Sequence, residues 1–444
     1  MESLIDLLIL GLSHRTAPVA VREKLSVQPD QMEAALRQMA ALPGVREAAF
    51  LSTCNRVEIY VAVSDREEAL RALTTDLALR ATLAEAELEP HIYTRVDAEA
   101  VHHLFRVAAS LDSLVIGEPQ ILGQVKDTHE TALRIGTAGP ILGLCFSRAF
   151  RVARRVRRET AIARNPVSVS SVAIELARQV FGSFDGRRLL IVGAGKMADL
   201  AARALQGQGA ALTVTNRTGA RADELAARMG AGTHPWDDLA GALGDADIVL
   251  ASTGAQQPVL TRTLLLKVQK ARRGRPLFVI DIAVPRDVEP SCADLEGIYL
   301  ADIDDLQKVA STHLDGRRSE ADQAEAIVEQ ELARFIESYR GRQVGPTVTA
   351  LRARVLGWAN ADADKTLAAF PQLGERERRA VRALAEGLAK KLLHPLQIAL
   401  KKDSGDALPL VTAVQRLFDL PAVEAVMPMA DEGDDEDQKK AAGR

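Results

Sequence analysis

The chain lacks the features of a secreted, disulfide-rich or membrane-spanning protein. It contains three cysteines, Cys54, Cys145 and Cys292, and none lies in a C-x-x-C pair or in a Cys/His cluster with zinc spacing. Neither a disulfide framework nor a metal site is therefore expected. No apolar run approaches the roughly 18 residues that a membrane span needs, and acidic residues interrupt the apolar N-terminal stretch, unlike a signal peptide. The sequence predicts a cytoplasmic protein.

Neither sign of charge is in large excess. The chain has 56 Lys and Arg against 60 Asp and Glu, and its hydrophobic share of 47% excludes wholesale disorder. Its 444 residues predict two to four domains. An acidic run at 431–437 predicts a disordered tail over residues 426–444.

The first ninety-odd residues alternate between strand and helix patterns. Apolar runs predict strands at 5–13, 47–52, 57–63 and about 91–94, with helices at 29–42 and about 66–83. This order is that of a ferredoxin-like α+β unit. We expect a catalytic domain over residues 1–165.

A basic helix is predicted near the end of this domain. It carries Arg148, Arg151, Arg154, Arg155, Arg157 and Arg158, interleaved with apolar residues. Two interpretations stay open. The arginines form a solvated face paired with acidic residues, or they contact the phosphate backbone of a nucleic acid.

Residues 166–312 have the pattern of a nucleotide-binding α/β domain. The segment 187–218 predicts a strand, a glycine-rich turn, a helix and a second strand, and 276–284 is a nearly continuous apolar run, as in a buried parallel strand. The turn consists of Gly193, Ala194, Gly195, Lys196, Met197 and Ala198. Its glycines allow a tight turn and close approach to a pyrophosphate, and the helix that follows supplies N–H donors. The sequence therefore predicts a Rossmann-type domain that binds a dinucleotide.

The end of the second strand predicts which dinucleotide. It reads Asn216, Arg217 and Thr218, without the acidic residue that usually binds the ribose 2′-hydroxyl of NAD. The Arg217 guanidinium is suited to a 2′-phosphate. NADPH is therefore the expected cofactor.

The chain from 313 to 425 predicts an all-α module. Charged helical sequence is followed by apolar-periodic segments at 346–368, 375–402 and 408–419, and Pro395 predicts a kink or a break. Such a module, without chemically reactive residues, is more often an oligomerisation or packing element than a catalytic one, and we expect a helical linker and dimerisation domain.

Cys54 lies in the turn between two predicted strands, next to Asn55 and Arg56. A lone cysteine is usually a small buried hydrophobic residue, but a thiol in a turn beside an arginine is placed to favour its nucleophilic thiolate. Combined with a nicotinamide domain, such a thiol can capture an acyl group as a thioester, which a hydride then reduces to an aldehyde.

Five stretches together resemble the signature motifs of the glutamyl-tRNA reductase family. They are residues 11–25 (GLSHRTAPVAVREKL), 51–60 (LSTCNRVEIY), 111–126 (LDSLVIGEPQILGQVK), the turn at 193–198 and 281–290 (DIAVPRDVEP). The resemblance implies NADPH-dependent reduction of glutamyl-tRNA to glutamate-1-semialdehyde, the first committed step of tetrapyrrole biosynthesis. It also implies a homodimer, and handover of the aldehyde to an aminomutase.

The resemblance implies a role for each matching residue. Cys54 would be the nucleophile, and His103 would polarise the carbonyl or help to deprotonate the thiol. The substrate site would consist of Thr53, Asn55, Arg56, Ser113, Glu118, Pro119, Gln120 and Gln124, with Arg56 suited to grip the substrate carboxylate. The family usually has glycine at Ser110, and Glu and Gly at Lys196 and Ala198.

Two alternatives remain. One is a shikimate-dehydrogenase-like oxidoreductase acting on a free small molecule, which leaves Cys54 without a role. The other is a non-catalytic nucleotide- or RNA-binding relative, against which the intact sequence around Cys54 argues.

Overall fold

The structure is a computed structural model that describes residues 5–114, 116–118, 120–162, 169–312, 318–401 and 407–420. The chain divides into two compact units. One unit spans Leu7–Glu329, and the other consists of Gln330–Arg444 with Met1–Asp6. The three predicted domain boundaries lie outside the described residues and stay predictions.

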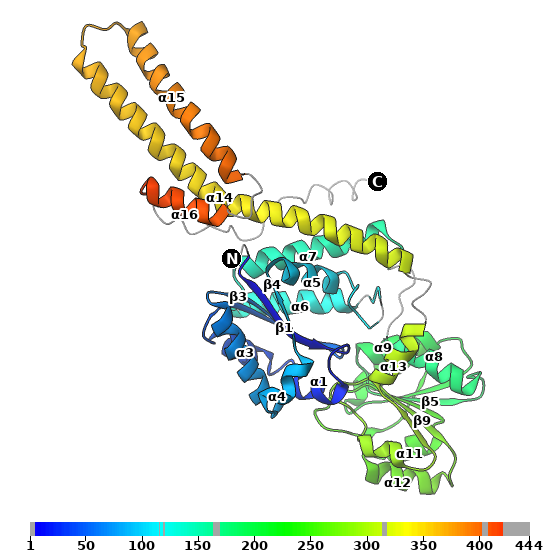
Figure 1. Ribbon diagram of the computed structural model, residues 1–444. Coiled ribbons are helices and arrows are strands. Elements are labelled where there is room, and N and C mark those ends of the chain that lie inside the picture. The colour runs from blue at the N-terminus through cyan, green and yellow to red at the C-terminus, as the bar shows by residue number, and fades with distance from the viewer. Residues whose placement is uncertain are drawn as a thin grey trace. The chain divides into compact units, whose positions relative to one another are not determined.

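The first sheet belongs to the predicted α+β unit and has four strands (Figure 1). Its strands are β1 (Leu7–Ser13), β2 (Val45–Ser52), β3 (Arg56–Val63) and β4 (Tyr93–Val96). They are arranged β2-β3-β1-β4, and all neighbours are antiparallel. The helices are α1 (Val19–Leu25), α2 (Met32–Ala40), α3 (Arg66–Ala81), α4 (Glu85–Leu88), α5 (Asp97–Ala108), α6 (Gln120–Ile135) and α7 (Pro140–Glu159), with a 3-10 turn η1 (Glu89–His91). The seven-residue helix α1 was not predicted.

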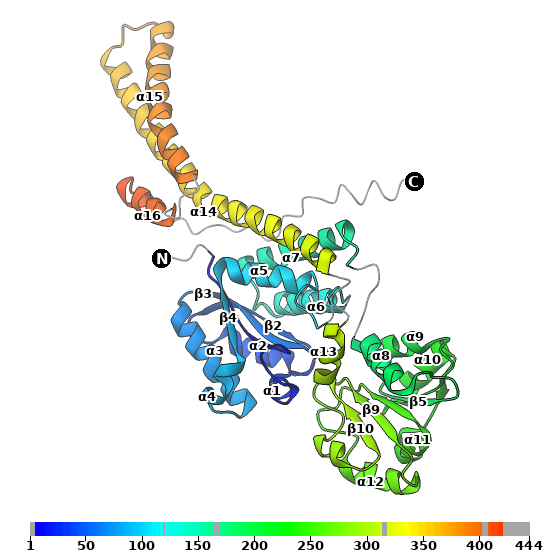
Figure 2. The same ribbon diagram turned by 45° about the vertical axis from the view of Figure 1, so that its right-hand side comes forward.

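The two faces of this sheet differ in chemistry because side chains alternate along each strand. Val57, Ile59 and Val61 of β3 are buried in an apolar core with residues of α2 and α3. Glu58 and Tyr60 lie on the opposite face, which α5, α6 and α7 cover (Figures 1 and 2). The sequence of β3 therefore places polar side chains beneath these helices.

The second sheet is parallel and has six strands. They are β5 (Arg188–Val192), β6 (Ala211–Thr215), β7 (Gly232–Thr233), β8 (Ile248–Ala251), β9 (Leu277–Asp281) and β10 (Ile298–Ala301). Their order, β10-β9-β8-β5-β6-β7, is the doubly wound order of a Rossmann fold. Ligands bind such sheets at the carboxyl ends of the strands, where the strand order reverses.

Helices cover both faces of the second sheet (Figure 2). They are α8 (Val169–Phe181), α9 (Lys196–Leu205), α10 (Gly219–Met229), α11 (Leu239–Asp245), α12 (Arg262–Ala271) and α13 (Ile303–Thr312), with 3-10 turns η2 (Trp236–Asp238) and η3 (Pro290–Asp294). Leu189 and Ile191 of β5 pack with residues of α8, α9, α10 and α13, whereas Leu190 and Val192 pack with α11 and α12. Burial on both faces explains the continuous apolar runs of these strands.

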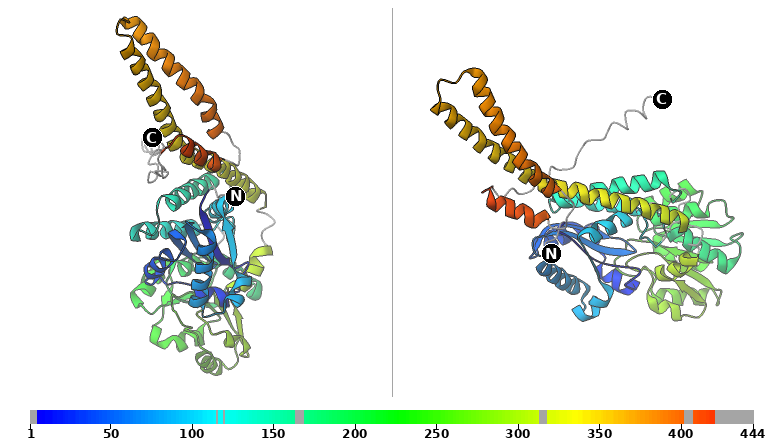
Figure 3. Two further views of the ribbon diagram at one scale, coloured as in Figure 1. Left: turned by 60° about the vertical axis from the view of Figure 1, so that its left-hand side comes forward. Right: turned by 45° about the horizontal axis from the view of Figure 1, so that its top comes forward.

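The last part of the chain is helical, as predicted. It contains α14 (Arg318–Ala369), α15 (Glu375–Lys401) and α16 (Ala407–Leu417), and α15 runs back along the second half of α14 (Figure 3). The helix α15 continues through Pro395, so the predicted break does not occur. The fold class, an α+β domain, a Rossmann-type domain and a helical module, is confirmed. Among the described residues, no helix is both long and apolar enough to cross a membrane.

Candidate active site

The turn that carries Cys54 connects β2 to β3 and is held in shape by Thr53. The Thr53 hydroxyl oxygen accepts hydrogen bonds from the backbone N–H groups of Asn55 (3.2 Å) and Arg56 (3.1 Å). The Asn55 carbonyl accepts another from the His14 N–H at 2.8 Å. Thr53, Asn55 and Arg56 are buried, whereas Cys54 stays partly exposed. Thr53 and Asn55 therefore shape the turn.

Cys54 lines a cavity of about 430 Å³ together with residues of the Rossmann-type domain. Ala194 and Gly195 of the glycine-rich turn lie in its wall, and so do the segments 252–254 and 282–284 that follow β8 and β9. The expected nucleophile and the expected nucleotide-binding turn, far apart in sequence, thus share one cavity. It opens at the carboxyl ends of the parallel strands, where a Rossmann fold binds its ligand.

A buried ion-pair cluster begins at Arg56. Its guanidinium donates to Glu58 (Nη1 to Oε1, 2.6 Å) and to Asp112 (Nη2 to Oδ2, 3.1 Å). The Arg56 and Glu58 side chains are at most 1% exposed. In this structure Arg56 therefore binds carboxylates of the protein, and the predicted grip on a substrate carboxylate requires an exchange of partners.

The Glu58 carboxylate forms hydrogen bonds with several other side chains. His103 Nε2 lies 2.7 Å from Glu58 Oε1, and the hydroxyls of Tyr60 and Tyr93 donate to the same carboxylate. Burial alone raises the pKa of Glu58, but the charge of Arg56 and these bonds outweigh it and hold the pKa well below its usual range. Gly11 makes room for this cluster, because a Cβ there would lie 2.8 Å from Glu58 Cγ.

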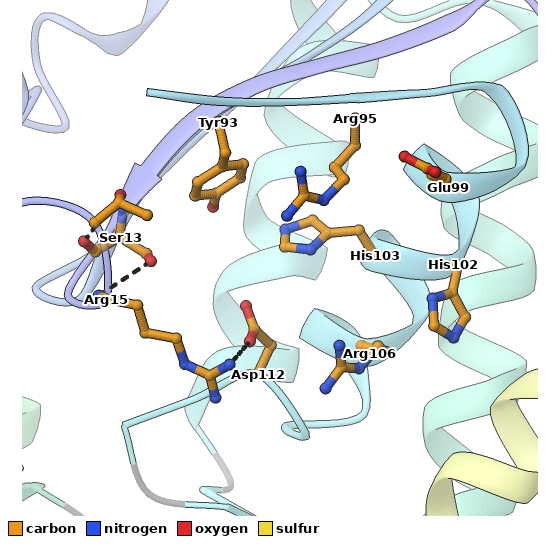
Figure 4. Close-up of a pocket in the computed structure, with 10 residues that line it drawn as sticks. Ser13, Arg15, Tyr93, Arg95, Glu99, His102, His103, Arg106 and Asp112 are labelled. Atoms are coloured by element: carbon orange, nitrogen blue, oxygen red, sulfur yellow. Dashed lines mark hydrogen bonds and ion pairs between the residues drawn. The ribbon is translucent and has the colours of Figure 1, made fainter. Parts of the chain in front are cut away.

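A second cavity of about 520 Å³ lies beside this cluster. Figure 4 shows its wall, formed by Tyr93 and Arg95 of β4, residues of α5 that include His103, and Arg15, whose guanidinium binds Asp112 at 3.0 Å. Asp112 therefore connects the solvent-facing Arg15 to the buried cluster.

Three possible metal ligands meet between α5 and α14. The ligand atoms of His102, Glu325 and Glu329 all lie within 4.8 Å of one another. However, Arg106 Nε lies 3.2 Å from Glu325 Oε2, and its positive charge disfavours a divalent cation at this position. We describe these residues as an ion-pair group.

The nearby arginines favour the Cys54 thiolate, as predicted, but in the free protein they do not make the thiolate the dominant form. Burial and the nearby Glu118 carboxylate raise the pKa of Cys54 to about 12, and the charges of Arg22 and Arg56 offset this only in part. Within the described residues, no hydrogen bond joins Cys54 to His103, whose Nε2 binds Glu58. The thiol therefore needs a proton acceptor.

Glu118 is the acidic residue whose charge acts on Cys54. Its side chain is buried, and burial raises its pKa to about 7, although a backbone hydrogen bond from Val169 and the charge of Arg56 lower it. A carboxyl group with this pKa can accept or donate a proton near neutral pH.

The other predicted substrate residues differ in whether they line the cavity that contains Cys54. Gln120 and Gln124, on the first turns of α6, line the cavity with Cys54. Ser113 is buried beside Asp112 in the chain. Pro119 lies outside the described residues.

The glycine-rich turn has the geometry that a dinucleotide requires. Gly193 has φ of +115°, and a Cβ there would lie 2.2 Å from the Ser252 carbonyl oxygen. Gly195 faces open space at the start of α9, and the small Ala198 is buried against the sheet. Lys196 and Met197 also line the cavity. The backbone thus requires the first glycine, whereas the open space at the second would let a ligand approach closely.

The residues after β6 divide between the cavity and the surface. Asn216 lines the cavity and donates a hydrogen bond to the Thr218 carbonyl (3.0 Å), whereas Arg217 is exposed. Arg221, on the first turn of α10, lines the cavity and was not predicted. In the described part of the chain, neither arginine pairs with a carboxylate. The spacing N-R-T-x-x-R after the strand is the signal that could have identified Arg221.

The six arginines lie on α7, whose apolar side, including Phe146 and Val152, is buried. Arg155 and Arg158 bind Glu159 at 3.0 and 3.1 Å, and Arg154 is exposed. Pairing with acidic residues thus accounts for some of these arginines, and both interpretations of the helix stay open.

Comparisons with known proteins cover all three parts of the chain. Family models match residues 10–160 (glutamyl-tRNAGlu reductase, N-terminal domain), 175–309 (shikimate / quinate 5-dehydrogenase) and 323–420 (glutamyl-tRNAGlu reductase, dimerisation domain). The chain is 46% identical over 420 residues to the glutamyl-tRNA reductase of Syntrophotalea carbinolica, covering 94% of each chain. It is 43% identical to that of Trichlorobacter lovleyi, covering 94% and 96%. The chain belongs to the glutamyl-tRNA reductase family.

The solved structure of a glutamyl-tRNA reductase is also similar to the chain. The glutamyl-tRNA reductase from Methanopyrus kandleri is 32% identical over 94% of this chain and 99% of its own, with a TM-score of 0.46. The shikimate dehydrogenase model covers only the Rossmann-type domain, whereas relatives in the glutamyl-tRNA reductase family cover nearly the whole chain. An oxidoreductase with a dinucleotide-binding domain follows from this membership.

The departure at Ser110 from the expected family glycine has a structural consequence. Ser110 follows α5 with φ of +63°, the left-handed conformation that glycine favours after a helix. Its hydroxyl donates to the Glu118 carbonyl at 2.7 Å. The serine thus accepts an unfavourable backbone conformation and ties the Glu118 loop to the end of α5.

Proposed function

We propose that this chain reduces the glutamyl group of glutamyl-tRNA to glutamate-1-semialdehyde, with NADPH and through a thioester on Cys54. The observation that carries this proposal is the shared cavity of Cys54 and the glycine-rich turn. An acyl group on the sulfur would lie in the cavity that the nucleotide-binding turn also lines. By its family membership, the chain would catalyse the first committed step of tetrapyrrole biosynthesis.

The residues of the cavity fit a dinucleotide phosphate. Gly195 leaves open space in front of the α9 N-terminus for a pyrophosphate, and Arg217 and Arg221 are positive charges near the end of β6, which ends in no acidic residue. These charges favour a 2′-phosphate over a 2′-hydroxyl, and hence NADPH. When bound, NADPH supplies a hydride.

The first chemical step would be acyl transfer to Cys54. The sulfur attacks the ester carbonyl, the bond to the terminal ribose oxygen of the tRNA breaks, and that oxygen takes the proton of the thiol. With the hydride that NADPH would supply, the thioester carbon would become the aldehyde carbon, and the Cys54 sulfur would leave as a thiolate and regain a proton.

Because the pKa of Cys54 is raised, we assign removal of the thiol proton to a neighbouring base. We place Glu118 in this role because its charge acts on the thiol and because its pKa of about 7 suits an acceptor at neutral pH. His103 would polarise the substrate carbonyl, with Glu58 orienting its ring. Arg56 would bind the substrate carboxylate after exchange with Glu58 or Asp112.

The helical module provides a surface for a second copy of the chain. Leu384, Leu388 and Leu392 recur every fourth residue on one face of α15 and are 55% to 69% exposed. The match of this region to a dimerisation domain supports a homodimer. Contact of α7 with the tRNA, and transfer of the aldehyde to an aminomutase, stay predictions.

The deciding experiment is mass spectrometry of the protein mixed with glutamyl-tRNA in the absence of NADPH. We expect a glutamyl adduct on Cys54 that is absent from Cys54→Ser and is discharged to an aldehyde when NADPH is added. A second sample with RNase-treated substrate tests the shikimate-dehydrogenase-like alternative, because a free small substrate survives that treatment.

The charge state of the tRNA separates the remaining outcomes. Deacylated tRNA without an adduct would mean that hydrolysis of the thioester outruns its detection. Glutamyl-tRNA that stays charged in the presence of folded, NADPH-binding protein would refute the proposal.

A further inference from the structure

Helix α1 contacts both the Cys54 turn and the Rossmann-type domain through one buried arginine. The Arg22 side chain is 0% exposed, and its guanidinium donates to the Cys54 carbonyl and to Asp304 Oδ1. Its Nε donates to the Ala17 carbonyl at 3.1 Å. The other oxygen of Asp304, a residue of α13, accepts the Val19 N–H at 2.8 Å. One guanidinium therefore joins the nucleophile's backbone to the nucleotide-binding domain.

The next residue of α1 makes a second connection. The Glu23 carboxylate accepts hydrogen bonds from Arg286 Nε (3.0 Å) and Nη2 (2.5 Å), and from the Arg286 backbone N–H (3.2 Å). Arg286 follows the segment 282–284, which forms part of the wall of the Cys54 cavity. Both connections thus join α1 to the Rossmann-type domain, one next to the Cys54 turn and the other next to the segment 282–284 of the cavity wall.

The contacts of Arg22 and Glu23 constrain both the distance and the orientation between the two domains. The two-pronged contact of Arg286 with Glu23 fixes direction as well as distance. Arg22 forms hydrogen bonds through three different nitrogens, a planar arrangement that lysine cannot reproduce. Near-attack geometry is sensitive to small displacements, and a misplacement of about 1 Å can cost about a hundredfold in rate.

We propose that Arg22 and Glu23 are positioning residues that set the Cys54 turn against the wall of the nucleotide cavity. They act through Asp304 and Arg286, and they set the distance for hydride transfer. Because the charge of Arg22 also lowers the pKa of the Cys54 thiol, the variants below change Glu23 and Asp304 and leave Arg22 in place. This inference rests on the proposed function, because it concerns the second of the two steps assigned to Cys54.

The test compares two rates in the same preparation. The first is deacylation of glutamyl-tRNA without NADPH, in which water hydrolyses the thioester and releases glutamate. The second is aldehyde formation with NADPH. We expect Glu23→Gln and Asp304→Asn to reduce aldehyde formation between about ten- and a hundredfold, and to change deacylation less than about twofold. NADPH affinity, from fluorescence titration, should stay at the wild-type value.

A charge exchange and a matched control complete the design. Glu23→Arg combined with Arg286→Glu should recover much of the aldehyde rate that either single variant loses. Glu33→Gln removes a carboxylate from an exposed pair with Arg37 and should change neither rate. Melting temperatures of all variants identify any that fail to fold, and the conservative Glu23→Gln keeps the test valid if Asp304→Asn unfolds.

The outcomes distinguish this inference from the proposed function. If the wild type makes aldehyde but Glu23→Gln and Asp304→Asn leave the ratio of the two rates unchanged, the positioning role is refuted and the function stands. If the wild type makes no aldehyde, the proposed function itself fails.

Discussion

The free protein should hold Cys54 as an unreactive thiol. At pH 8, a thiol with a pKa of about 12 is ionised to about one part in 10⁴, whereas a cysteine at the ordinary value of 9.0 is ionised to about one part in ten. Alkylation requires the thiolate, so Cys54 should react with iodoacetamide about 10³-fold more slowly than an unperturbed cysteine. Its rate should rise about tenfold per pH unit from pH 8 to 10, where Glu118 is already mostly ionised.

The substitution Glu118→Gln tests the cause of this suppression. Because Glu118 has a pKa of about 7, it is mostly ionised at pH 8, where its negative charge disfavours the Cys54 thiolate. Its neutral replacement should therefore speed alkylation at pH 8. At pH 6, where most wild-type Glu118 is protonated, the two proteins should differ much less.

The assay follows the Cys54 peptide by mass spectrometry at each pH. The same protein unfolded in urea gives the unperturbed rate, and Cys54→Ser shows that label on Cys145 and Cys292 is not counted. A wild-type rate that reaches its plateau near pH 8, or a Glu118→Gln variant that reacts more slowly at that pH, would refute the electrostatic argument.

Four further predictions follow from the structure. Glu58→Gln leaves the buried charge of Arg56 with one fewer carboxylate and should lower the free energy of unfolding by about 3–5 kcal/mol. The melting temperature should fall, and an unchanged melting temperature would contradict this prediction. Gly193→Ala should abolish NADPH binding or folding, because its Cβ would lie 2.2 Å from a carbonyl oxygen; normal fluorescence titration would contradict this. Arg221→Ala should weaken NADPH binding at least about tenfold and leave NADH unchanged; equal losses would argue against a 2′-phosphate contact. Ser110→Ala should destabilise by about 1 kcal/mol through the lost hydrogen bond, whereas Ser110→Gly regains much of this by relieving the left-handed backbone; urea unfolding that ranks them in reverse would contradict the argument.

The placement of polar residues on β3 explains how one strand serves both folding and chemistry. Residues Val57, Ile59 and Val61 build the apolar core, while Arg56 and Glu58 on the alternate positions build the ion-pair cluster. A shift of register by one residue would exchange the two faces. The hydrogen bonds of Thr53 fix the turn that precedes the strand, and so help to fix this register.

The sequence by itself determined most helices and strands, their succession along the first domain and the nucleotide-binding turn. Apolar periodicity depends on neighbours along the chain, and the conformational needs of a turn such as Gly193 are local, so both could be predicted. The short helix α1 was not predicted because its seven residues are too few to show a helical period. The predicted break at Pro395 was wrong, because α15 continues through it.

Only the tertiary structure decided the electrostatics of the candidate site. The sequence placed an arginine two residues after Cys54, but the fold turns that guanidinium toward Glu58 and Asp112, and brings Glu118 near the thiol instead. A pKa depends on burial and on charges within a few ångströms, and those are set by residues that lie far apart in the chain. For the same reason the sequence did not indicate the contacts of Arg22, because its partners lie 32 and 282 positions away in the chain.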